Sequence, residues 1–389
     1  MSLQESGMNI KKILLLLFAA SFMFSSCDLL SPSSHIEKEY IVRTDAPSAY
    51  AIRIRNLGKE TFLSGLSLNG KGFFASDAEV LEEVLSSSGT QTGAFEIKLF
   101  DYIKNNRYHF IPASSKEWAH SPALFFNSIG FGFCDDTAMI YCRLASAAGF
   151  DARVWELTGH VVPEIKINGR WKMLDPDLGI YYFNPDGEIA GVEELSLHPE
   201  YIIKPVHPSI VPPHAVYSSR IADYYVSSRD NRVTVRNYKP SSTKVFKLTV
   251  PPRGQIEFPG VFHQPFITMN GELAPSYANL KVTVPVGWTG IMNNPLVLHA
   301  LRGTGTVRIN EKYFVIGSAE LQLYLDDREG HDYIYDFEII ESHSDISVIY
   351  LINGMRFKLK GVNVVKIEAP VDNLAVDACE LPPENRIYR

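Results

Sequence analysis

A cysteine, a histidine and two aspartates between residues 130 and 177 are the residues of this chain best suited to nucleophilic chemistry. Cys134 follows Gly130 and Gly132 and stands at the expected start of a helix. The partial positive charge at a helix N-terminus favours a thiolate, as does a neighbouring histidine, and the thiolate is the nucleophilic form of cysteine. We therefore expect Cys134 to be a nucleophile, and the alternative is a buried structural cysteine.

The helix expected after Cys134 ends before Gly149, a residue type favoured just beyond a helix C-terminus. Cys142 lies in the middle of this helix without glycine neighbours, which is typical of a structural cysteine. The two cysteines are eight residues apart on one helix, so their Cα atoms lie about 12 Å apart, beyond the roughly 7 Å that a disulfide tolerates. Small and apolar residues recur on the face that carries Cys134: Ala138, Tyr141, Ala145 and Ala148.

The histidine lies in a predicted β-hairpin. His160–Ile167 and Arg170–Leu174 are expected strands, and Asn168-Gly169 between them is a two-residue turn that fixes their register. A further strand is expected over residues 151–157.

In that register Val162 opposes Asp175 and His160 opposes Asp177. His160 and Asp175 therefore share one face as diagonal neighbours, about 7–8 Å apart or somewhat less. A carboxylate at this position can hold an imidazole in one tautomer by a hydrogen bond. Asp177, directly opposite His160, is a competitor for the same role.

These segments together resemble the core of the transglutaminase-like superfamily. The resemblance rests on GFGFCDD, AAGFDARVWEL, GHVVPEI and GRWKMLDPD, and it covers roughly residues 93–185. It implies a papain-like core with a catalytic triad, in which Cys134 is the nucleophile, His160 the general base and acid, and Asp175 the orienting carboxylate. The family often has a tryptophan two residues after the histidine, where this chain has Val162.

An oxyanion hole is expected beside Cys134, whose backbone N–H is the natural first donor. The second donor stays open among Asn127, Tyr108, His109 and Trp118. The resemblance implies acyl transfer, in which a thiolate attacks an amide or ester and the acyl-enzyme is released to water or an amine. No cofactor is implied.

We expect a cysteine peptidase or amidase that hydrolyses an amide bond in a peptide or cell-envelope substrate. A protein cross-linking enzyme is the first alternative, and a non-catalytic cell-surface protein that binds carbohydrate or a protein partner is the second. Several aromatic residues could stack on a sugar through the C-terminal region, although most are expected in strand cores: Tyr224, Tyr225, Trp288, Tyr333 and Tyr335.

The N-terminus has the pattern of a secretory signal peptide. Lys11 and Lys12 precede an apolar run over residues 13–24, and Cys27 follows two serines. The run is about a dozen residues, shorter than the ~20 of a membrane-spanning helix. It resembles a bacterial lipoprotein signal, which implies that Cys27 is lipidated and anchors the chain in the cell envelope, at a periplasmic or outer-membrane surface. Phe24 and Ser26 depart from the commonest pattern, so a soluble secreted form stays an alternative.

Net charge, residue spacing and a proline cluster support the remaining predictions. The net charge of −7 and the lack of a long basic run exclude a nucleic-acid partner, and the histidines and cysteines lack the spacing of a metal site. Four prolines within residues 205–213 indicate a linker over 205–216. We therefore predict a signal peptide over 1–27, a transglutaminase-like α+β core with an N-terminal extension over 28–204, in which helices pack on an antiparallel sheet, and a β-sandwich-like region over 217–389.

Overall fold

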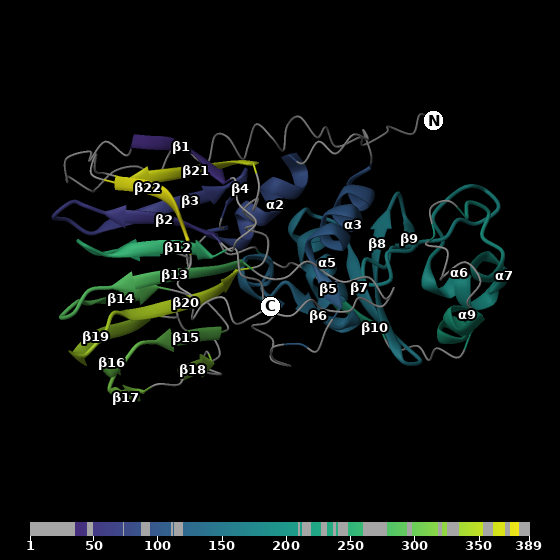
Figure 1. Cartoon of the computed structure of the whole chain (residues 1–389). Coiled ribbons are helices and arrows are strands. Elements are labelled where there is room, and N and C mark those ends of the chain that lie inside the picture. The colour runs from purple at the N-terminus through teal and green to yellow at the C-terminus, as the bar shows by residue number, and fades with distance from the viewer. Residues whose placement is uncertain are drawn as a thin grey trace, which may run out of the picture. The chain divides into compact units, whose positions relative to one another are not determined.

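The computed structural model of the chain describes residues 36–44, 50–72, 74–86, 94–109, 112, 120–208, 211, 219–226, 232–235, 239, 248–259, 278–293, 298–317, 321–324, 334–352, 361–369 and 374–380 (Figure 1). It has the predicted α+β class, with mostly antiparallel sheets. Cys27 and the predicted signal peptide lie outside the described residues. None of the described helices is long and apolar enough to cross a membrane.

One four-stranded sheet carries the predicted hairpin. Its order is β10-β7-β8-β9, with all neighbours antiparallel. Asn168 and Gly169 both adopt positive φ angles, of 51° and 80°, as a type I′ turn requires. The resulting register pairs Ile167 with Arg170 and Glu164 with Met173, as predicted. The strands are β7 (Ala152–Leu157), β8 (His160–Ile167), β9 (Arg170–Met173) and β10 (Arg232–Val235).

Helices cover both faces of this sheet, because strand residues alternate between two cores. Val154 and Ile165 belong to the core of α5, whereas Trp155 and Val162 belong to a second core. Figure 1 shows α6, α7 and α9 gathered together apart from α3 and α5. The first core contains α2 (Asp77–Ser86), α3 (Phe95–Asn106), α4 (Pro122–Leu124), the π-helix Phe125–Ile129 and α5 (Cys134–Ala147), and the second contains α6 (Val192–Leu197), α7 (Glu200–Ile203) and α9 (Ser219–Val226).

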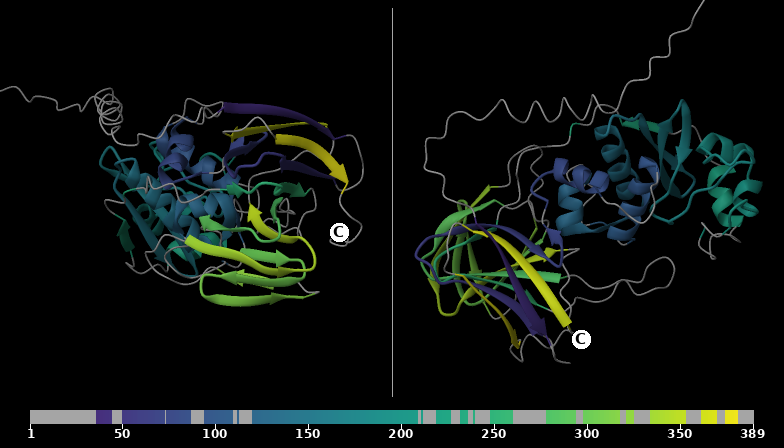
Figure 2. Two further views of the ribbon diagram at one scale, coloured as in Figure 1. Left: turned by 90° about the vertical axis from the view of Figure 1, so that its left-hand side faces the viewer. Right: turned by 90° about the horizontal axis from the view of Figure 1, so that it is seen from above.

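Apart from the two-stranded sheet of β5 (Tyr108–His109) and β6 (Phe131–Gly132), the other strands form three sheets around a single hydrophobic core (Figure 2). Their orders are β1-β21-β3-β11 with β4 attached to β3, then β18-β15-β20-β13-β12-β2-β22, and β14-β19-β16-β17. The strands are β1 (Ile36–Thr44), β2 (Tyr50–Asn56), β3 (Phe62–Leu68), β4 (Lys71–Gly72), β11 (Leu248–Val250), β12 (Gln255–Pro259), β13 (Ala278–Val284), β14 (Thr289–Asn293), β15 (Leu298–Arg302), β16 (Gly305–Ile309), β17 (Lys312–Ile316), β18 (Leu321–Tyr324), β19 (Ile334–Ser342), β20 (Ile346–Ile352), β21 (Gly361–Ala369) and β22 (Leu374–Glu380).

Strand pairing crosses the predicted division between residues 28–204 and 217–389 in both directions. The N-terminal strand β1 pairs with β21, and β2 lies between β12 and β22, so the purple strands β1 and β2 each pair with a yellow strand in Figure 1. Ile52 and Ile54 of β2 are fully buried there, which explains why this amphipathic strand needs a partner sheet. In the opposite direction, β10 pairs with β7, and α9 packs in the second core of the α+β part.

Most of the predicted proline-rich linker over 205–216 lies outside the described residues. Helix α4 begins at Pro122, and the chain continues from it as a π-helix through Ile129. Gly130 ends that π-helix with a φ of 62°, a conformation that costs glycine little.

Candidate active site

Cys134 is the first residue of α5, and it is half-buried. Phe133 before it is extended, and its N–H donates to the Asp136 carboxylate over 2.8 Å. A carboxylate in the first turn accepts a hydrogen bond from an N–H that would otherwise be unpaired, and its negative charge is stabilised by the positive end of the helix dipole. His120 Nε2 contacts the other oxygen of Asp136 at 3.0 Å, so the start of α5 is fixed by side chains from two segments.

Only glycine fits at position 132, two residues before Cys134. A Cβ atom added to Gly132 would lie 2.7 Å from Oδ2 of Asp136 and 2.8 Å from its Cβ. Gly132 belongs to β6 (Phe131–Gly132), which pairs in parallel with β5 (Tyr108–His109). Because Gly132 has no side chain, the Asp136 carboxylate can lie against it and accept the N–H of Phe133.

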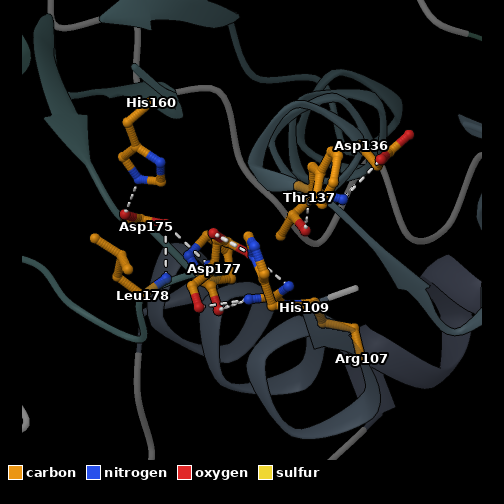
Figure 3. Close-up of polar contacts among 10 residues, drawn as sticks. Arg107, His109, Asp136, Thr137, His160, Asp175, Asp177 and Leu178 are labelled. Carbon is orange, nitrogen blue, oxygen red and sulfur yellow. Dashed lines mark hydrogen bonds and ion pairs between the residues drawn. The ribbon is translucent and has the colours of Figure 1, made fainter. Parts of the chain in front are cut away.

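His160 and Asp175 form the predicted hydrogen bond (Figure 3). His160 Nε2 lies 2.7 Å from Asp175 Oδ2, and the two side chains are 6% and 0% exposed. Asp175 Oδ1 accepts the backbone N–H groups of Asp177 at 2.9 Å and Leu178 at 3.1 Å. The β8–β9 ladder ends at Met173, and a turn, rather than a diagonal strand pair, delivers the carboxylate to the histidine.

The other ring nitrogen of His160 is left for the thiol. Because Nε2 bonds Asp175, Nδ1 is the atom that hydrogen-bonds the sulfur of Cys134. Burial alone would lower the pKa of His160, but the charge of Asp175, its hydrogen bond and the Cys134 thiolate together raise that pKa to about 11. Tyr224 of α9 packs on the same imidazole, with ring centroids 5.6 Å apart. The pair is thus suited to a thiolate–imidazolium state.

Asp177 does not orient His160; it has partners of its own. Its carboxylate forms an ion pair with Arg107 and contacts His109 Nδ1 at 2.9 and 3.1 Å (Figure 3). Burial raises the pKa of this carboxyl, yet the Arg107 guanidinium and His109 hold it below its usual value. Asp175 is therefore the orienting carboxylate and Asp177 the centre of a second network. Sequence reasoning missed Arg107, which no motif marks, and the contact of Tyr224.

The structure narrows the four candidates for the second donor of the oxyanion hole. The side-chain amide of Asn127 makes two hydrogen bonds to the backbone of Phe74. Its oxygen accepts from the Phe74 N–H at 2.9 Å, and its NH₂ group donates to the Phe74 carbonyl at 2.8 Å. Trp118 lies outside the described residues. Tyr108 and His109 lie in β5, beside the strand that leads to Cys134. These two residues are the candidates that the described geometry leaves next to the nucleophile.

Cys134, His160 and Asp177 also present ligand-type atoms within 4.8 Å of one another. The sequence spacing predicts no such metal cluster. Each partner is already engaged, His160 with Asp175 and Asp177 with Arg107 and His109.

Cys142 is a structural cysteine. It is fully buried in the core of α5, and burial raises the pKa of its thiol well above the ordinary value. A neutral thiol without solvent access is a poor nucleophile. The distinction between the two cysteines agrees with the sequence prediction.

Fold and site together define an α+β protein with a cysteine, a histidine and a carboxylate assembled at a helix N-terminus. Comparison with protein-family models, with curated proteins and with solved structures finds no match for the chain.

Proposed function

We propose that the chain is a cysteine enzyme of the transglutaminase-like type that catalyses acyl transfer through Cys134, His160 and Asp175. The observation that carries the proposal is the 2.7 Å bond between His160 and Asp175, which fixes the ring so that its other nitrogen meets the thiol. A helix that begins at the cysteine and packs on the antiparallel sheet bearing the histidine supports a papain-like core.

In this mechanism the Cys134 thiolate attacks the carbonyl carbon of an amide. The Cys134 backbone N–H, unpaired within the first turn of a helix, stabilises the oxyanion. The imidazolium of His160 gives its Nδ1 proton to the leaving amine, and the acyl group remains on the sulfur. Water then releases the acid, so that the reaction is hydrolysis of a peptide or cell-envelope amide.

A carbohydrate-binding role has less support among the described aromatic residues. Tyr225 is fully buried, Tyr224 packs on His160, and Trp288 packs against Phe337 with ring centroids 5.7 Å apart. Tyr333 and the side chain of Tyr335 lie outside the description. Tyr224, Tyr225 and Trp288, the predicted sugar-stacking residues whose side chains are described, thus serve packing or the candidate active site.

We expect iodoacetamide to alkylate Cys134 of the native protein at least about 100-fold faster than Cys142, because a paired, accessible thiolate reacts and a buried thiol does not. Peptide mapping by mass spectrometry at timed intervals measures both rates in one sample. Cys134→Ala is the control that removes the fast site, and Cys142→Ala should leave it. Equal, slow alkylation of the two cysteines in native protein would contradict the proposal.

We also propose that the chain is a lipoprotein anchored in the cell envelope through Cys27. The motivating observation is the basic, apolar and Ser-Ser-Cys order of residues 11–27. Expression in a bacterium fed alkyne-labelled palmitate should label the wild type, whereas Cys27→Ser should carry no label and leave the membrane fraction. Label retained in Cys27→Ser would refute the anchor.

A further inference from the structure

A second histidine–carboxylate pair stands beside the nucleophile. His109 Nδ1 lies 2.9 and 3.1 Å from the two oxygens of Asp177, and Asp177 presents an oxygen within 4.8 Å of the Cys134 sulfur. His109 pairs across β5 and β6 with Gly132, two residues before the cysteine. Its ring lies 5.5 Å from that of Phe133, centroid to centroid. The reaction described above uses none of these contacts.

The proton of this pair has a defined place. The Arg107 ion pair keeps Asp177 ionised, and a carboxylate can only accept, so Nδ1 of His109 carries the hydrogen. A neutral ring then has its lone pair on Nε2. The side chain of His109 is 27% exposed, so small molecules and solvent reach it, whereas Asp177 is 2% exposed.

We propose that His109 and Asp177 form a second dyad, in which Nε2 of His109 takes the proton from the acyl acceptor. The proposal rests on the acyl-transfer function proposed above and assigns the second half-reaction. The acceptor, water or a primary amine, forms a bond from its oxygen or nitrogen to the acyl carbon while its proton passes to Nε2. The carbon–sulfur bond breaks and Cys134 leaves as a thiolate. The His109 imidazolium gives its proton to solvent, and His160, neutral since it protonated the leaving amine, takes a proton from solvent, which restores the thiolate–imidazolium pair.

The two dyads present different ring nitrogens to the reaction. His160 offers Nδ1 to the sulfur because Asp175 holds Nε2, and His109 offers Nε2 because Asp177 holds Nδ1. Loss of His109 should therefore slow deacylation and spare acylation. Loss of an oxyanion donor would instead slow both steps, since both pass through a tetrahedral intermediate.

The test is a burst experiment with 4-nitrophenyl acetate on the full chain. The wild type should release one equivalent of nitrophenolate per enzyme rapidly and then turn over slowly. His109→Gln and His109→Ala should keep the burst and lower the later rate about 100-fold, the size of a general-base contribution. Hydroxylamine, a nucleophile that attacks without a base, should restore the rate. His198→Ala removes an exposed histidine that contacts Glu200 at 3.0 Å, and it is the matched control that should change neither phase.

The outcomes separate the two proposals. A wild-type burst with both phases slowed equally in the His109 variants, or with neither slowed, overturns the second dyad alone. A wild type that releases nitrophenolate no faster than Cys134→Ala, or a burst that survives in Cys134→Ala, overturns the acyl-transfer function and the dyad with it. A wild type that turns over without a burst should acquire one in the His109 variants. Thermal melting of each variant identifies any that is not folded, and agreement of the Gln and Ala variants guards against a packing effect.

Discussion

Asp175→Asn should lower kcat for amide hydrolysis by about 10³–10⁴-fold while the fold is retained. The asparagine oxygen can still accept the N–H groups of Asp177 and Leu178, so the turn survives. Its NH₂ group then faces Nε2 of His160, which must become an acceptor. The ring hydrogen moves to Nδ1, and the imidazole can no longer take the proton of the Cys134 thiol.

The pH profile distinguishes this effect from simple loss of packing. With Asp175 present, the pKa of His160 is raised to about 11, so the imidazole keeps its proton through neutral pH and loses it only at alkaline pH. Without the carboxylate, burial dominates and lowers the pKa of His160, so the alkaline limb of kcat/KM moves toward acid. Asp186→Asn, an exposed change in a turn, should leave the profile unchanged. A profile identical to wild type in Asp175→Asn would exclude Asp175 as the orienting carboxylate.

Asp177→Ala should destabilise the native state by about 3–5 kcal/mol, because it leaves a buried guanidinium without its counter-charge. The Arg107 side chain is 4% exposed, and it also donates to the backbone carbonyls of Pro176 and Asp177. Urea unfolding at neutral pH measures the loss. Asp101→Ala, which removes an exposed partner of Lys104 at 3.9 Å, is the control and should cost under about 1 kcal/mol.

The destabilisation should depend on pH with a fixed sign. The pKa of Asp177 is lowered on folding, so its contribution is fully present above the unfolded value of 3.8 and is lost as pH falls through the folded pKa. The wild type and Asp177→Ala should therefore converge in stability on acidification. A gap between them that stays constant down to strongly acid pH would rule out the charge as its cause.

The hairpin and its dyad could be predicted because they are local. Alternation in β8, the Asn168-Gly169 turn and a register counted outward from it decide which side chains share a face. The same counting made Asp177 a competitor for Asp175. It could not decide between them, because strand β9 ends at Met173 and the choice is made by a turn whose path no periodicity encodes.

Contacts between residues far apart in the sequence could not be predicted in this way. Arg107 meets Asp177 some seventy residues later, and Tyr224 reaches His160 from beyond the proline-rich stretch. Both residue types are ordinary on exposed surfaces, so nothing in their neighbours marks a buried partner. The pairing of β1 with β21 was missed for the same reason, since each strand alone shows only that one of its faces needs covering.

Strand β1 has a consequence for synthesis. Its residues Ile36 to Thr44 pair with Ala369 to Gly361, so its partner is synthesised long after β1 itself. Residues 77–235, whose helices and four-stranded sheet share their own two cores, are complete far earlier. Chains grow from the N-terminus, and unpaired strand edges invite association with other chains. Until β21 has been synthesised, β1 lacks its partner strand, so we expect its exposed edge to be open to association with other chains during that interval.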